Sequence, residues 1–334
     1  MRISVLDTTP VPSGATAAQA VANTLDLARH AESLGLVRYW LAEHHNAGAL
    51  ACPAPEIMIA AVAAVTKTIR VGSGGVMLPN HSPLKVAETF RVLGALHPGR
   101  IDLGVGRAAG TDPKTALALR QAKELVGAER FPEQLEELLH YLTHEPDPHE
   151  RFGPLKAIPI GVAPPPIFVL GSGPDSARLA ASRGLGYAYA HHIGPHEYAE
   201  AVRLYRASFV PSASLAAPYA ILAVATACCE SEAQAEDLER ASALGWLRFG
   251  QGLRDLPAPS VEEARAYAFD ADEEVLRKAG QGRLLVGEPA RVADTLRALV
   301  ERSGADEIMA LTGVHDQAER RRSYDRLVAA LDVR

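Results

Sequence analysis

Short apolar segments alternate with longer helical segments along almost the whole chain. The apolar segments are nearly continuous rather than alternating, which is typical of parallel strands covered on both faces. The segments between them carry apolar residues at helical spacing, as Val21, Leu25 and Ala28 do within 17–34. We therefore predict eight strands, at residues 3–7, 38–42, 69–73, 101–105, 167–170, 186–190, 219–227 and 307–311.

Local signals at the helix ends support the same alternation. Thr16 and Gln19 have the spacing of a capping box, in which side chains bind the free amides at a helix start. Gly35, Gly184 and Gly304 each stand shortly before a predicted strand. Glycine at such a position ends a helix by adopting the left-handed conformation.

Eight strand–helix units in succession predict a (β/α)₈ TIM barrel, an α/β fold whose functional residues follow the carboxyl ends of the strands. A doubly wound sheet with a dinucleotide site fits less well, because the first strand runs into "DTTPVPSG" instead of a G-x-G-x-x-G turn. The 334 residues exceed the ~250 typical of such barrels. We predict one domain over 1–334, with insertions near 108–165 and 228–288.

Charge and cysteine content exclude several classes of protein. The net charge is −6 and no run of Lys or Arg suggests a nucleic-acid or membrane face, so we expect neither kind of partner. Cys52, Cys228 and Cys229 have neither disulfide nor zinc spacing, which indicates a reducing compartment. Asp7 interrupts the first apolar segment, and no later segment reaches membrane-spanning length. We expect a cytoplasmic protein.

Polar residues follow five of the predicted strands directly. In a barrel these residues converge on one mouth. They are Glu43, His44 and His45 after the second strand, "GSGGVMLPNHSP" (72–83) after the third, Arg107 after the fourth, "GSGPDS" (171–176) after the fifth, and His191 and His192 after the sixth.

The segment after the fifth strand predicts an anion site. Gly171, Ser172 and Gly173 lead into a helix that has Pro174 at its first position. Free amides at a helix start bind phosphate, and the hydroxyls of Ser172 and Ser176 are further donors. Arg107 can add a bidentate contact. An ordinary capped turn, with Arg107 in a structural ion pair, explains the same residues and stays open.

The remaining strand ends indicate a flat ligand and a proton carrier. Ser73, Gly74 and Gly75 do not open a helix; glycines there let a flat molecule approach the backbone, although a simple turn is the alternative. Neighbouring side chains on a strand point opposite ways, so at most one histidine of each pair faces the mouth. The histidines have no third ligand at a suitable spacing, so we do not predict a metal site. Phosphate site, flat platform and imidazole together suit a flavin.

Four stretches resemble the bacterial luciferase-like monooxygenase family, nearer to its bacterial oxidoreductase branch than to the light-emitting enzymes. The stretches are "YWLAEHHN", "IRVGSGGVMLPNHSPLKVAETFRVLGALHPGRIDLGVGRAAGTDP", "VLGSGPDSARLAA" and "YAYAHH". The resemblance runs from the first strand to the sixth and weakens over 228–285. It implies a TIM barrel, usually dimeric, that binds reduced FMN at the carboxyl ends of its strands.

The resemblance also implies roles for individual residues. Ser73, Gly74 and Gly75 match a bulge beneath the isoalloxazine ring that often contains a non-proline cis peptide. His44 matches an imidazole near the reactive edge of the flavin, whereas Gly106 stands where luciferase has a reactive cysteine. We therefore expect His44 and Glu43 to be catalytic. The expected cofactor-binding residues are Ser73, Gly74, Gly75, Arg107, Gly171, Ser172, Gly173, Ser176 and His191.

The implied activity is that of a flavin-dependent monooxygenase, in which reduced FMN and O₂ oxygenate a small organic substrate. The expected partners are a second copy of the chain and a flavin reductase that supplies reduced FMN. Two alternatives stay open. One is an oxidoreductase of the same family that uses the deazaflavin F420, and the other is a flavin-binding protein without turnover.

Overall fold

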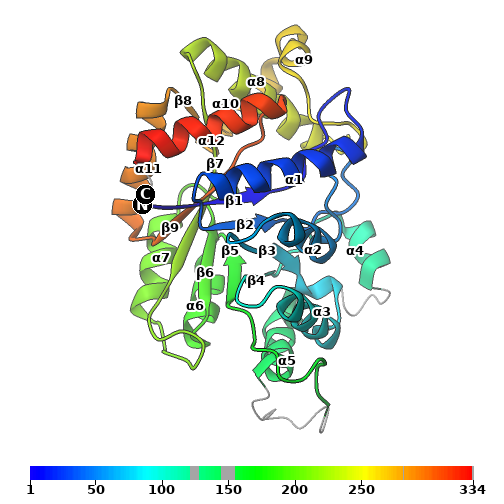
Figure 1. Ribbon diagram of the computed structural model, residues 1–334. Coiled ribbons are helices and arrows are strands. Elements are labelled where there is room, and N and C mark those ends of the chain that lie inside the picture. The colour runs from blue at the N-terminus through cyan, green and yellow to red at the C-terminus, as the bar shows by residue number, and fades with distance from the viewer. Residues whose placement is uncertain (121–127, 144–154, 281, 333–334) are drawn as a thin grey trace.

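Eight parallel strands close into a barrel with helices on its outside (Figure 1). The computed structural model describes residues 1–120, 128–143, 155–280 and 282–332. The ring closes because β9 pairs with both β7 and β1. The strands are β1 (Arg2–Asp7), β2 (Arg38–Leu41), β3 (Arg70–Met77), β4 (Ile101–Gly106), β5 (Ile167–Gly171), β6 (Gly186–Ala190), β7 (Ala220–Cys228), β8 (Leu284–Gly287) and β9 (Glu307–Leu311).

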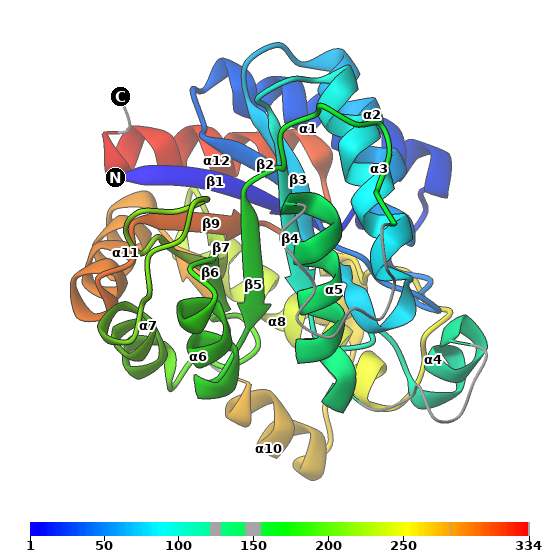
Figure 2. The ribbon, with the colours of Figure 1, turned by 90° about the horizontal axis from the view of Figure 1, so that it is seen from below.

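Helices surround the ring, as the view along a second direction also shows (Figure 2). The helices are α1 (Ala17–Ser33), α2 (Pro55–Val65), α3 (Pro83–Leu96), α4 (Pro113–Arg120), α5 (Phe131–Thr143), α6 (Pro174–Ser182), α7 (Tyr198–Ala207), α8 (Glu232–Gly250), α9 (Val261–Ala266), α10 (Ala271–Ala279), α11 (Pro289–Ser303) and α12 (Gln317–Leu331). Short 3₁₀ turns lie at η1 (Leu78–Asn80) and η3 (Ala128–Arg130). None of the described helices is long and apolar enough to cross a membrane.

The barrel and its eight strands confirm the fold predicted from the sequence. The glycine signals are confirmed too, because Gly35, Gly184 and Gly304 have φ angles of 74°, 61° and 71°. The capping box of α1 is only half formed. The Thr16 hydroxyl accepts from the Gln19 amide at 3.2 Å, but the Gln19 side chain donates to Asn23 instead of returning to Thr16.

The strand β8 was not predicted. It extends the sheet beyond the barrel, because it pairs with the last residues of β7, Ala225–Cys228, past most of the pairing with β9. Its four residues give only a short apolar run in the sequence, and three of them are half-buried. It belongs to the predicted insertion 228–288, together with α8, α9 and α10. The predicted insertion 108–165 contains α4, η3 and α5, and its residues 121–127 and 144–154 lie outside the described ones.

Side chains fill the inside of the barrel, so it is a second core and not a channel. Trp40 lies edge to face on Phe168, with ring centroids 5.0 Å apart. Leu6, Ile221 and Met309 pack around them. The larger core lies between the strands and the surrounding helices.

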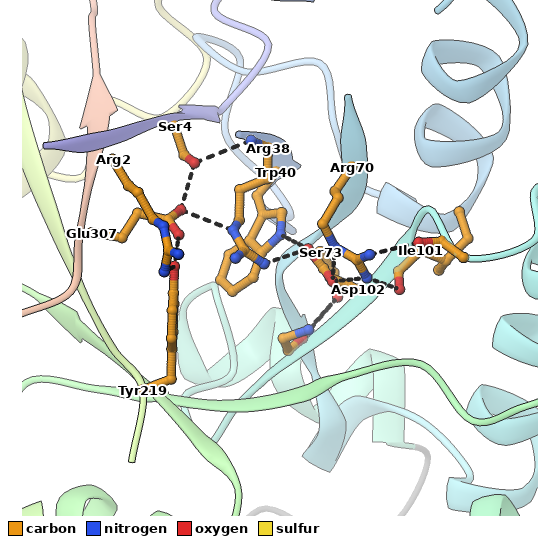
Figure 3. A network of polar contacts seen from close by, with 12 residues as sticks. Arg2, Ser4, Arg38, Trp40, Arg70, Ser73, Ile101, Asp102, Tyr219 and Glu307 are labelled. Atoms are coloured by element: carbon orange, nitrogen blue, oxygen red, sulfur yellow. Dashed lines mark hydrogen bonds and ion pairs between the residues drawn. The ribbon is translucent and has the colours of Figure 1, made fainter. Parts of the chain in front are cut away.

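A buried network of charges occupies the amino-terminal end of the barrel (Figure 3). The Arg38 guanidinium binds Asp102 at 2.7 Å and Glu307 at 2.8 Å. Arg70 binds the other oxygen of Asp102 at 2.6 Å, and the Trp40 indole donates to Asp102 at 3.1 Å. The network joins β2, β3, β4 and β9 at the end opposite the mouth, and each carboxylate in it is fully buried and paired.

Candidate active site

Strand register brings the predicted strand-end residues together. Gly106 of β4 pairs with Met77 of β3 on one side and with Leu170 of β5 on the other. Arg107 follows Gly106 directly, and Gly171 follows Leu170. Arg107 therefore lies between the ends of β3 and β5. The flat platform was predicted at the first of these ends and the anion site at the second.

The platform at β3 is a bulge stabilised by a serine. The register between β3 and β4 shifts between Ser73 and Val76, and the Gly74–Gly75 peptide is cis. The Ser73 hydroxyl donates to the Gly104 carbonyl at 2.8 Å and accepts from the Gly104 amide at 3.0 Å. The bulge and the cis peptide that the resemblance implied are thus both present.

Glycine is required in this bulge because its surroundings are closely packed. A Cβ atom on Gly74 would lie 2.6 Å from Leu6 Cδ1, and one on Gly75 would lie 2.8 Å from the Gly104 carbonyl oxygen. A side chain at either position would displace the barrel core or the neighbouring strand. The absence of Cβ atoms therefore lets the bulge pack directly against the barrel core and against β4.

The start of α6 has free amides. Its N-cap residue is Gly173, whose lack of a side chain leaves the first turn without a side-chain cap. Asp175, in the first turn, is exposed and pairs with Arg178 at 3.3 Å. A Cβ atom on Gly173 would meet nothing within 4 Å, so the turn is open to an approaching ligand.

Two residues of this turn have structural roles. The Ser176 hydroxyl donates to the Gly173 carbonyl at 2.8 Å and lies 3.3 Å from the Tyr187 hydroxyl. A Cβ atom on Gly171 would lie 2.1 Å from that Ser176 oxygen. Gly171 therefore lets α6 pack against β5, and the hydroxyl of Ser176 is already engaged by the turn.

Arg107 is the exposed cation of this site. Its guanidinium makes no hydrogen bond or ion pair with any residue in the described parts of the chain. The structural ion pair that the sequence left open is therefore not seen there. An unpaired arginine that follows β4, with the free amides of α6 after the neighbouring β5, supplies groups suited to binding a phosphate.

Glu43 is a buried acceptor that ties the end of β2 to the segment after β3. One carboxylate oxygen accepts from His45 Nε2 at 2.7 Å and from His81 Nε2 at 2.9 Å, and the other accepts from the Met77 amide at 2.8 Å. Burial raises the pKa of Glu43, but these donors outweigh burial and hold it below its usual value. Glu43 is a positioning residue in this arrangement.

Sequence reasoning did not identify His81 as a partner of Glu43. His81 lies in "PNHSP", within the segment that follows the third strand. A buried carboxylate requires donors, so the only available signal was that Glu43 would need partners from another strand end. Burial lowers the pKa of His81, but Glu43 more than compensates and raises it.

The two histidine pairs each divide, as strand geometry predicts. His45 binds Glu43, whereas His44 Nδ1 is buried without a hydrogen-bond partner among the described residues. Burial lowers the pKa of His44, so its ring is neutral near pH 7. His192 lies near enough to His44 that the charge of His44, after burial, lowers the pKa of His192.

His191, the member of the second pair that we expected to bind the cofactor, packs against a helix. Its ring packs edge to face on Tyr198 of α7, with centroids 5.2 Å apart, and burial lowers its pKa to about 4. His192, the next residue, instead directs its Nδ1 toward the Ala223 carbonyl oxygen of β7, 3.2 Å away.

The pairing of Glu43 with His81 predicts a pH dependence. The lowered pKa of Glu43 contributes stability above its ordinary value of 4.5, and the raised pKa of His81 contributes stability below its ordinary value of 6.5. The pair should stabilise the fold most between these values and less as pH rises through the pKa of His81. In an NMR titration, Glu43→Gln should make His81 titrate at a lower pH. An unchanged midpoint would contradict the pairing.

The geometry defines a class of protein: a parallel barrel with a glycine bulge, an uncapped helix start and a neutral imidazole at the carboxyl ends of its strands. The chain belongs to the luciferase-like monooxygenase family, whose family model matches residues 1–307. This confirms the resemblance seen in the sequence. Among the described residues, no group of three or more His, Cys, Asp or Glu is placed to hold a metal ion.

Individual relatives are similar over nearly their whole length. The chain is 38% identical to a luciferase-like monooxygenase of Escherichia coli (strain K12), covering 99% of this chain and 96% of that protein. It is 36% identical to the N-acetyl-S-alkylcysteine monooxygenase of Bacillus subtilis (strain 168), covering 99% and 98%. The crystal structure of apo-MsnO8 has a TM-score of 0.89 and 40% identity, covering 100% and 99%.

More distant structures share the fold alone. The oxygenating constituent of 3,6-diketocamphane monooxygenase from Pseudomonas putida, in complex with FMN, has a TM-score of 0.69 and 22% identity, covering 98% of this chain and 96% of that one. An F420-dependent secondary alcohol dehydrogenase has a TM-score of 0.64 and 14% identity, covering 99% and 98%.

Proposed function

We propose that the protein is a monooxygenase that uses reduced FMN and O₂ to oxygenate a small organic substrate. The observation that carries this proposal is the unpaired Arg107 between the glycine bulge of β3 and the uncapped start of α6. These groups supply a place for a phosphate next to a place for a flat ring.

The phosphate would be held by three kinds of donor. Arg107 supplies charge, the first-turn amides of α6 supply oriented N–H groups, and Ser172 supplies a hydroxyl. Ser176 takes part through its amide, because its hydroxyl is engaged with Gly173. The isoalloxazine ring would lie over the bulge at 73–75, as the resemblance implies.

Bound reduced FMN supplies the electrons with which O₂ is activated. The contribution of this chain is to exclude water and to move a proton. The barrel interior beneath the bulge is filled by Leu6 and Trp40, so that side of the site is dry. His44 is the neutral imidazole available to accept a proton from substrate or cofactor, while Glu43 and His45 hold the loop that carries it.

The mouth favours FMN over F420. F420 has a longer acidic tail and would need several basic groups. In the part of the chain that the structure describes, Arg107 is the one Lys or Arg directly following a barrel strand. Each of the two cofactors is named for a structure that shares this fold, so both belong in the test.

The test combines binding with oxygen uptake. The purified protein is titrated anaerobically with FMN and with F420, in oxidised and reduced forms, and O₂ uptake is then followed with the bound cofactor. N-acetyl-S-methylcysteine is a suitable first substrate, because a relative is an N-acetyl-S-alkylcysteine monooxygenase. We expect FMN binding and substrate-dependent oxygenation. Binding of F420 alone, or of FMN without turnover on any substrate tried, would overturn the proposal.

Arg107→Ala is expected to weaken FMN binding by about 1.5–3 kcal/mol, the range for a hydrogen bond to a charged group. The loss corresponds to roughly 10- to 150-fold in the dissociation constant. Isothermal titration calorimetry of both proteins measures it. Arg29→Ala, which removes an equal charge from the exposed face of α1, is the matched control and should bind FMN as the wild type does. Equal affinities for all three proteins would remove Arg107 from the site.

A further inference from the structure

The loop after β6 holds an imidazole to which the proposed chemistry gives no role. The ring nitrogen Nδ1 of His192 lies 3.2 Å from the carbonyl oxygen of Ala223, and the His192 amide lies 3.4 Å from the same oxygen. A carbonyl oxygen can only accept, so Nδ1 carries the hydrogen. In the neutral ring the other nitrogen, Nε2, then carries a lone pair and can only accept.

The ring of His192 is oriented by its neighbours in β6 and β7. The Tyr189 hydroxyl donates to the Gly194 carbonyl at 2.7 Å and so holds the loop that follows His192. A Cβ atom on Gly194 would lie 3.3 Å from Ser172 Cβ, which places this loop against the anion-binding turn. Backbone and ring contacts to Ala223 anchor the other side. The direction of Nε2 is therefore set before any ligand binds.

Nε2 of His192 is available at the mouth. In the eight-stranded ring β6 lies opposite β2, whose end carries His44, so the residues that follow the two strands border the same mouth. Nε2 makes no hydrogen bond to any described residue. Burial lowers the pKa of His192 more than its hydrogen bond to Ala223 raises it, so the ring stays neutral and Nε2 stays an acceptor near pH 7.

We propose that His192 Nε2 accepts a hydrogen bond from the ring system of the bound flavin and thereby favours the reduced form over the oxidised form. This inference rests on the proposed function. The reduced ring carries a hydrogen on N5 that the oxidised ring lacks, and N5 belongs to the reactive edge near which the resemblance places His44. A fixed acceptor at this mouth stabilises the N–H group of the reduced ring. In the oxidised ring N5 has only a lone pair, which the lone pair of Nε2 repels.

The test compares two isosteric substitutions. In His192→Asn the side-chain amide can still donate to Ala223, but no atom remains at the position of Nε2. In His192→Gln a carbonyl oxygen reaches that position and can still accept. The dissociation constants of reduced and oxidised FMN are measured anaerobically for the wild type and both variants.

The ratio of the dissociation constants of oxidised and reduced FMN tests the inference. We expect the preference for reduced FMN to fall about five- to tenfold in His192→Asn, as for one hydrogen bond, and to stay within about twofold of wild type in His192→Gln. An unchanged ratio in His192→Asn overturns the inference and leaves the proposed function intact. Failure of the wild type to bind FMN in either form overturns the proposed function itself.

A second measurement needs only the wild-type fold. NMR of protein labelled with ¹⁵N in its histidines reports which ring nitrogen carries the hydrogen, and the signal that is lost in His192→Asn identifies His192. We expect the Nδ1–H tautomer at pH 7 in the free protein and a shift of the Nε2 signal when reduced FMN is added. An Nε2–H tautomer in the free protein would overturn the inference.

Discussion

Replacing Asp102 by alanine is expected to lower the free energy of unfolding by about 3–5 kcal/mol, the cost of leaving buried charges unpaired. Asp102 is completely buried and binds Arg38 at 2.7 Å and Arg70 at 2.6 Å. Its removal would leave the buried Arg38 with Glu307 as its one carboxylate partner, Arg70 with backbone carbonyls only, and the Trp40 indole without its acceptor. The change lies at the amino-terminal end, so it tests the barrel and not the proposed site.

Urea unfolding followed by circular dichroism and tryptophan fluorescence measures this loss. Asp294→Ala is the matched control, because Asp294 also pairs with an arginine, Arg297 at 2.9 Å, but on the exposed surface of α11. An exposed pair contributes about 0–1 kcal/mol, so the control should be nearly neutral. If Asp102→Ala cost no more than Asp294→Ala, the buried network would not stabilise the barrel.

His44→Ala is expected to reduce turnover by about 10²- to 10⁴-fold while leaving FMN affinity within a few-fold, as for the loss of a general acid–base group. The expectation follows from its buried, unpartnered Nδ1 at the mouth and from the anchoring of the neighbouring Glu43 and His45. Because burial lowers the pKa of His44, the neutral ring predominates at pH 6.5 and above. Wild-type turnover should therefore fall as pH drops through that lowered pKa.

Single-turnover mixing of the reduced-FMN complex with oxygenated buffer and substrate separates chemistry from binding. His97→Ala is the control, since His97 ends α3 at the amino-terminal side of the barrel and should leave turnover unchanged. Normal turnover in His44→Ala would remove this imidazole from the chemistry. A loss of FMN affinity as large as the loss of turnover would instead assign His44 to binding.

Much of the fold was predictable because its signals are local. A run such as 101–105 and a glycine such as Gly304 act through neighbours in the chain, and both were found where predicted. The strand β8 was not predicted because it is short, half-buried and defined only by pairing with the end of β7. The half-formed capping box at Thr16 shows the same limit, since spacing does not decide which partner Gln19 takes.

The site was predictable as a set of segments and not as a set of contacts. The barrel rule brings strand ends to one mouth, and the register of β3, β4 and β5 does bring Arg107 beside the bulge and the start of α6. Strand alternation predicted that each histidine pair would divide. It could not say that His191 packs on Tyr198 while His192 binds the Ala223 carbonyl of β7, because both residues lie beyond the end of β6.

The amino-acid sequence by itself determined the strand order, the helix ends and the glycines that make a bulge possible, because these depend on periodicity and on backbone conformations available to single residues. Only the tertiary structure decided that Arg107 is unpaired, that Glu43 is occupied by His45 and His81, and which nitrogen of His192 carries its hydrogen. Those outcomes depend on which donors and acceptors meet across strands distant in the chain, and hydrogen bonds act only over about 3 Å.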